Sequence, residues 1–278
     1  MAECRGYLFV SLALIASCTA VRAQDAKEMI QRIVDAEYAA YQNDHSDWIY
    51  LQETLQAKHH DVFWVAQTDD GEIQRLVEED EHPVPLSKQQ ELIQNFMQSP
   101  EARKKQVAEI NHDRQQIIAL MRLLPAGFIW TQTSANSSVM CFHFEPSPHF
   151  HPPTREARVF SGMAGDLIAD SRQYRVLSVR GHLIRDVTFG GGLFGRLKQG
   201  GFFSIEQDQV GLTLWQLKAV HVHLYGNALL FKSVALEEDD ERSNFELEPS
   251  AMTLEKAADA VMRRPDFHPL LQPVASNH

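Results

Sequence analysis

The stretch from residue 128 to residue 247 constrains the fold most, because strand-like segments and turns follow one another there without any long helix. Short polar or glycine-containing pairs, such as Asp170 with Ser171 and Gly226 with Asn227, mark the turns. Strands joined by such short turns pair antiparallel, since a parallel pair needs a long crossover connection. The expected strands cover residues 128–133, 138–145, 156–169, 173–188, 201–209, 213–225, 228–237 and 242–248.

The first half of the chain adds helices to this sheet. Apolar residues recur at helical spacing over residues 25–43, and a strand meander follows over 48–57, 61–67 and a segment from Ile73. Further helices are expected over 86–99, where Ser87 and Gln90 resemble a capping box, and over 101–124 and 254–262. These patterns predict an α+β fold with one domain over residues 24–264, a helical insert at 86–124 and a flexible tail at 265–278.

The first 23 residues have the features of an export signal. An apolar run from Tyr7 to Ala16 follows Arg5, and Val21-Arg22-Ala23 offers a cleavage site before Gln24. Ile15-Ala16-Ser17-Cys18 offers an alternative, because it resembles the lipobox in which the cysteine is lipidated. We therefore expect a periplasmic protein, or an outer-membrane lipoprotein if Cys18 carries lipid.

Composition excludes some functions and leaves others open. The formal net charge of −11 argues against a nucleic-acid partner, since phosphate binding needs a concentrated basic face. Cys4 and Cys18 lie in the expected signal, so Cys141 is left alone and no disulfide is expected within the mature chain.

Candidate catalytic and metal-binding residues do not complete a recognised pattern. Cys141 and His143 share one face of an expected strand, but a structural role is the simpler interpretation. His221 and His223 share a face with Trp215 in this alternation, yet no third ligand stands at a diagnostic spacing. The glycine-rich stretch 190–201 lacks the Lys and Ser or Thr of a phosphate loop. We expect no enzyme activity, no metal and no cofactor.

The late strands carry large apolar side chains on both faces. Because an antiparallel sheet with one wet face alternates apolar and polar residues, something apolar must cover each face here. Helices can cover one face, and the other meets more protein or a cavity. The residues chosen as the lining of such a cavity are Trp215, Leu217, Phe231, Phe202 and Met163.

Four segments carry a family resemblance: 144–148 (FEPSP), 152–159 (PPTREARV), 162–165 (GMAG) and 186–192 (DVTFGGG). They resemble a group of exported bacterial proteins of unknown function, and the order of helices and strands is similar to the outer-membrane lipoprotein-sorting (LolA/LolB-like) superfamily. The resemblance implies a strongly curved antiparallel sheet, a half-barrel, with helices covering its concave side. It also implies an apolar cavity that can hold acyl chains.

Three functions remain as expectations. The first is non-enzymatic binding of a lipid or other apolar ligand in the half-barrel. The second is a structural or partner-binding role in the cell envelope, with the interior filled by the protein's own side chains. The third is an enzyme that depends on a metal or on Cys141, which the missing site patterns disfavour.

Overall fold

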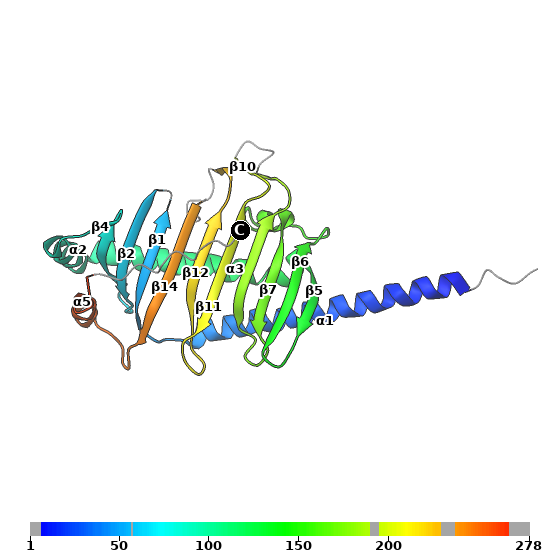
Figure 1. Ribbon diagram of the computed structural model, residues 1–278, viewed down its shortest axis with the longest axis horizontal. Helices are drawn as coiled ribbons and strands as arrows, with labels where there is room; N and C mark the ends of the chain where they lie inside the picture. Colours follow the sequence, from blue (N-terminus) through cyan, green and yellow to red (C-terminus); the bar gives the residue numbers. More distant parts are fainter. Residues whose placement is uncertain (1–6, 57, 190–194, 229–236, 267–278) are drawn as a thin grey trace, which may run out of the picture. The chain divides into compact units, whose positions relative to one another are not determined.

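The computed structural model describes residues 7–56, 58–189, 195–228 and 237–266, and it confirms an α+β fold with an antiparallel sheet (Figure 1). Eleven strands form this sheet, which is not closed into a barrel over the described part of the chain. None of the described helices is long and apolar enough to span a bilayer. The chain divides into two compact units, residues 1–44 with 112–239 and residues 45–111 with 240–278.

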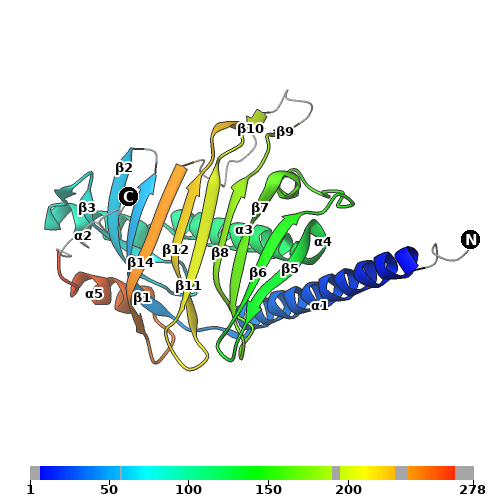
Figure 2. The ribbon, with the colours of Figure 1, turned by 45° about the vertical axis from the view of Figure 1, so that its right-hand side comes forward.

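The first unit contains six neighbouring strands in the order β12-β11-β8-β7-β6-β5, and β14 (Glu237–Leu247) begins in it. A small sheet in the order β13-β10-β9 lies beyond the ends of β8 and β11 (Figure 2). The bounds of these strands are β5 (Phe128–Ala135), β6 (Val139–Pro146), β7 (Met163–Asp170), β8 (Val176–Leu183), β9 (Val187–Phe189), β10 (Gly195–Leu197), β11 (Phe202–Gln209), β12 (Trp215–His223) and β13 (Gly226–Ala228).

Strict alternation places one face of this sheet in the core. Met140, Phe142 and Phe144 on β6 are buried, and they cluster with Phe128 and Trp130 on β5. Helix α1 (Tyr7–Asn43) covers them with residues at helical spacing, namely Ala26, Ile30, Ile33 and Val34. The same cluster is contacted by Leu120, near the end of α3 (Pro100–Met121), and by α4 (Leu124–Gly127) through Leu124. Aromatic rings and aliphatic residues thus form one apolar layer beneath α1.

The second unit has the strand order β4-β3-β2-β1, and its core lies beneath two helices. Ile49, Trp64 and Ile73 from the strands meet Ile93 of α2 (Leu86–Gln98) and Val261 of α5 (Leu254–Met262). The strands are β1 (Trp48–Gln56), β2 (His59–Ala66), β3 (Ile73–Glu79) and β4 (His82–Pro83). The meander and the helix predicted over 254–262 are confirmed.

Some predicted strand boundaries are wrong. Residues 156–162, predicted as the start of a strand, form the 3₁₀ helix η1 (Glu156–Gly162) before β7. The hydroxyl of Thr154 accepts the N–H of Ala157 at 3.1 Å, and Ala157 and Phe160 are buried three residues apart, the spacing of a 3₁₀ turn. The strand predicted over 173–188 is divided between β8 and β9, which belong to different sheets.

The helices of the predicted insert also differ in detail. The capping box is wrong, because α2 begins at Leu86 with Pro85 at the N-cap and no side-chain cap, so Ser87 lies inside the first turn. Pro100 begins α3 as its first residue, where the missing N–H costs nothing. No residue of α3 is fully buried, and Ile117 is 59 % exposed.

Candidate functional site

The five residues chosen as a cavity lining do not share one surface. Met163 and Trp215 are buried, Leu217 is half-buried and Phe202 is 43 % exposed. Met163 pairs with Leu183 and belongs to the cluster beneath α1, whereas Phe202 pairs with His182 on the opposite face. Phe231 lies outside the described residues.

The predicted face of Trp215, shared with His221 and His223, is wrong because β12 contains a β-bulge. The register of β11 and β12 pairs Glu206 with Ala219 and then Gln207 with Leu217, so Lys218 is an extra residue on β12. Beyond this bulge the alternation is inverted. Trp215 and Leu217 therefore share the α1-side face with Phe203, whereas Ala219, His221 and His223 lie on the other face.

A buried polar network holds Trp215 against the α1 side. Arg175 lies with its guanidinium 5.5 Å from the centre of the Trp215 ring, and the indole N–H of Trp215 donates to Gln173 at 3.1 Å. Arg175 in turn forms an ion pair with the buried Glu37 of α1, at 3.0 Å between Nε and Oε1. The Trp215 indole N–H thus has an acceptor and the Arg175 guanidinium has a counter-charge, so Trp215 serves to attach α1 to the sheet.

Next to this network, the α1-side face of β11 and β12 is apolar and incompletely covered. Apart from the buried Trp215, the apolar side chains on this face are half-buried, and their shared face follows from the strand register. Phe203 packs against the cluster beneath α1, so this apolar strip continues the core without a polar boundary. Together with Val179 of the neighbouring β8, the residues that form this apolar strip are Phe203, Ile205, Leu217, Val220 and Val222.

The opposite face of the same sheet is polar and rich in histidine–carboxylate pairs. His143 Nδ1 lies 2.8 Å from Asp166 Oδ1. His221 Nδ1 and His223 Nε2 lie 2.7 and 2.9 Å from one oxygen, Oδ1 of Asp239. The Phe202 ring stacks on His223 with ring centres 4.7 Å apart. Sequence reasoning missed Asp239, because its strand β14 is separated from β12 by many residues and only the sheet brings them together.

These side chains do not form a metal centre in the described ranges, where no group of three or more His, Cys, Asp or Glu residues is arranged to hold an ion. Both imidazole nitrogens point at the same carboxylate oxygen at hydrogen-bond distance, so they do not surround a shared point as ligands of zinc would. Cys141 is a free, half-buried thiol, and its neighbour His143 is directed to Asp166.

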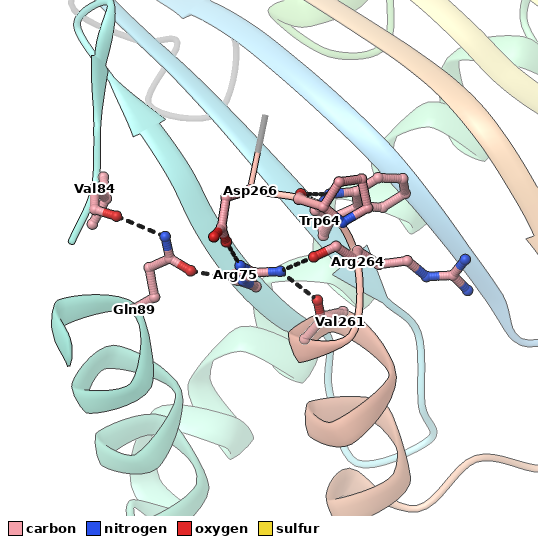
Figure 3. A network of polar contacts seen from close by, with 8 residues as sticks. Trp64, Arg75, Val84, Gln89, Val261, Arg264 and Asp266 are labelled. Atoms are coloured by element: carbon pink, nitrogen blue, oxygen red, sulfur yellow. Dashed lines mark hydrogen bonds and ion pairs between the residues drawn. The ribbon is translucent and has the colours of Figure 1, made fainter. Parts of the chain in front are cut away.

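The second unit contains a buried arginine whose role is structural (Figure 3). Arg75 is 1 % exposed and donates from Nε to Gln89 at 2.7 Å. Its Nη1 donates to the carbonyl oxygens of Val261 at 2.9 Å and Arg264 at 2.7 Å, and its Nη2 pairs with Asp266. A cation thus meets the carbonyl-rich end of α5, which the helix dipole favours. This network attaches the chain after α5 to β3.

A second polar cluster in this unit surrounds Tyr50. The phenol is buried, and its burial raises its pKa above the ordinary value of 10.0, while the positive charge of Arg242 acts in the opposite direction. The guanidinium of Arg242 lies 5.3 Å from the Tyr50 ring, and its Nε donates to Asp240 at 2.9 Å. Gln52 also donates to Asp240, so both oxygens of the buried carboxylate accept hydrogen bonds. We therefore assign this cluster a structural role as well.

Comparison with known proteins adds no identification: no model of a known protein family matches the chain, and no curated protein matches it.

Proposed function

We propose that this protein binds an apolar ligand, the acyl chain of a lipid, on the α1-side face of the first unit and performs no covalent chemistry. The observation that carries the proposal is the apolar strip on β8, β11 and β12, which extends the core while its side chains remain half-buried. When an apolar partner removes uncovered apolar surface of this kind from water, the free energy of the system falls by about 25 cal/mol per Å².

Features of the same unit support an apolar ligand over a polar one. Polar side chains on this face of β11 begin only beyond Ile205, at Gln207 and Gln209. Ile117, on the part of α3 that belongs to this unit, is 59 % exposed, so a helix as well as the sheet offers apolar surface. In contrast, the opposite face carries imidazoles and carboxylates, which would lose their hydrating water if an acyl chain lay on them.

We further propose that the sheet is a strongly curved half-barrel whose concave side is covered by helices. Its support is that α1 and the end of α3 contribute side chains to the same cluster as five strands of the sheet. In a sheet that curves around helices, the strands farthest from α1 would be covered less than the strands beneath it. The burial of side chains on the α1 side decreases in this way from β6 to β12.

We also propose that the chain is exported, with residues 1–23 as its signal. The support is the apolar run and the two processing sites read from the sequence. The intact mass of the protein from its own cell envelope tests this. A chain beginning at Gln24 supports a periplasmic form, and a diacylglyceryl group on Cys18 supports an outer-membrane lipoprotein. An uncut chain contradicts both.

The binding proposal is tested with a fluorescent fatty acid titrated into the purified protein. Ile205 lies on the apolar strip, and its neighbour Ser204 lies on the opposite face of the same strand. We expect Ile205→Glu to weaken binding by about 2 kcal/mol, roughly thirtyfold, because a charge would be buried against the acyl chain. Ser204→Glu is the matched control and should bind as the wild type does. Each of the two variants should keep the melting transition of the wild type.

If the wild-type protein takes up no fatty acid, the second candidate applies: a structural or partner-binding envelope protein with a filled interior. Its support is the ring packing beneath α1, where the Phe128 ring centre lies 4.8 Å from that of Phe144 and 4.9 Å from that of Phe160. Such spacings leave no room for a ligand at that end of the sheet.

A further inference from the structure

Strand β5 ends the strand order of the first unit, and no strand pairs with its outer side within the described residues. Its neighbour on the inner side is β6, and residues 131–135 of β5 are all exposed. An edge of this kind presents a row of backbone N–H and C=O groups that can pair with another strand.

The usual protections of a sheet edge are sparse on β5. The strand has eight residues, FIWTQTSA, and it contains no proline, no glycine and no charged side chain. Its one irregularity is a register shift between Gln132 and Ser134. The strand at the end of the other unit's order, β4, shows the contrast: it has two residues, includes Pro83 and follows two residues with positive φ, Asp80 and Glu81.

We propose that β5 is an interface on which a second copy of this chain pairs antiparallel through residues 131–135, extending the sheet across a two-fold axis. The absence of charge is what selects a second copy. In an antiparallel self-pair each residue near the axis meets itself or a close neighbour of the same strand, so any charge would oppose its own copy. The protein as a whole carries a net charge of −11, and β5 is a stretch on which two such chains can meet without that repulsion.

Side-chain character also suits this pairing. Threonine and the β-branched Ile129, which is 47 % exposed, favour strand surfaces and form good cross-strand pairs. Pairing would cover Ile129 in part and would satisfy the outward backbone groups of the exposed residues. A helical partner would leave these backbone groups unpaired, because its own backbone groups are already paired within the helix.

The test uses the full mature protein and paired charge variants of Gln132, which is exposed and near the centre of the exposed segment. We expect the wild type to dimerise reversibly in sedimentation equilibrium. Gln132→Glu and Gln132→Lys should each weaken the dimer roughly five- to tenfold, because like charges then face each other. Mixing the two variants should restore the dimer as a heterodimer, most strongly at low salt. Gln115→Glu and Gln115→Lys, on the exposed surface of α3, are the matched controls and should leave the dimer unchanged.

Hydrogen exchange gives a second readout that does not depend on the variants. Amides of residues 128–135 should exchange more slowly in concentrated wild-type protein than in dilute protein. The proposal is overturned if the wild type is monomeric throughout, if both Gln132 variants dimerise as the wild type does, or if mixing them fails to restore the dimer. Should one variant fail to fold, Thr131→Glu and Thr131→Lys repeat the same test one residue away.

Discussion

Glu37 Oε1, on helix α1, accepts a hydrogen bond from the backbone N–H of Val176, at the start of β8, at 2.6 Å. The same carboxylate pairs with Arg175. A buried acid thus joins the helix to the sheet, because it accepts from a backbone donor and supplies the counter-charge of a partly buried guanidinium.

Removing this carboxylate should destabilise the protein strongly. We expect Glu37→Ala to lower the free energy of unfolding by about 3 kcal/mol, because Arg175 would lose its counter-charge and the buried Val176 N–H would lose its acceptor. Glu37→Gln keeps an acceptor and should cost less. Urea unfolding followed by tryptophan fluorescence measures both. Glu109→Ala removes an exposed helical ion pair with Lys105 and should change stability by less than about 0.5 kcal/mol.

Lysine should not replace Arg75. The planar guanidinium donates in three directions, to Gln89, to two carbonyl oxygens and to Asp266, and an ammonium group on a flexible stem cannot reach all of them. We expect Arg75→Lys to cost about 2–3 kcal/mol and to speed hydrogen exchange in residues 258–266. Arg180→Lys is the comparison, since that arginine is largely exposed in its pair with Glu206 and should lose little. Equal effects of the two substitutions would contradict the structural role of Arg75.

Tyr50 should make the protein less stable in alkali. Its burial raises the pKa of the folded-state phenol above the ordinary value of 10.0, so the folded state holds this proton more tightly than the unfolded state. The contribution is complete below about pH 10 and is lost as the pH rises beyond it, at up to about 1.4 kcal/mol per pH unit. Unfolding free energies measured from pH 9 to 11.5 check the slope. Tyr50→Phe has no phenol to titrate, so its slope over this range should be shallower than that of the wild type.

Two glycines should respond differently to alanine. A Cβ on Gly165 would lie 2.0 Å from the carbonyl oxygen of Arg180, so Gly165→Ala must move the backbone of β7 or β8 and should cost several kcal/mol. A Cβ on Gly200 meets nothing within 4 Å, but φ is +92° there, so Gly200→Ala should cost only about 1 kcal/mol. Thermal melts of the two variants give the comparison, and a milder effect at Gly165 than at Gly200 would refute it.

The sequence by itself determined the α+β class, the antiparallel sheet and most helices, because these depend on local periodicity and turn residues. Alternation in Met140–Phe144 alone shows which face of β6 is buried, and α5 occupies the predicted 254–262. Period-two patterning is a short-range property, so each strand can be read without knowledge of its neighbours.

The tertiary structure decided on which face of the sheet Trp215 lies and which residues distant in the sequence contact one another. Lys218 is an extra residue only relative to β11, so the inversion that puts Trp215 on the α1 side is invisible in the sequence of β12 alone. Likewise, Glu37 and Arg175 meet across 138 positions, and Asp239 reaches His221 and His223 only through the pairing of distant segments. Such contacts depend on register and packing between elements, which are set by the free energy of the whole fold and leave no periodic trace in the chain.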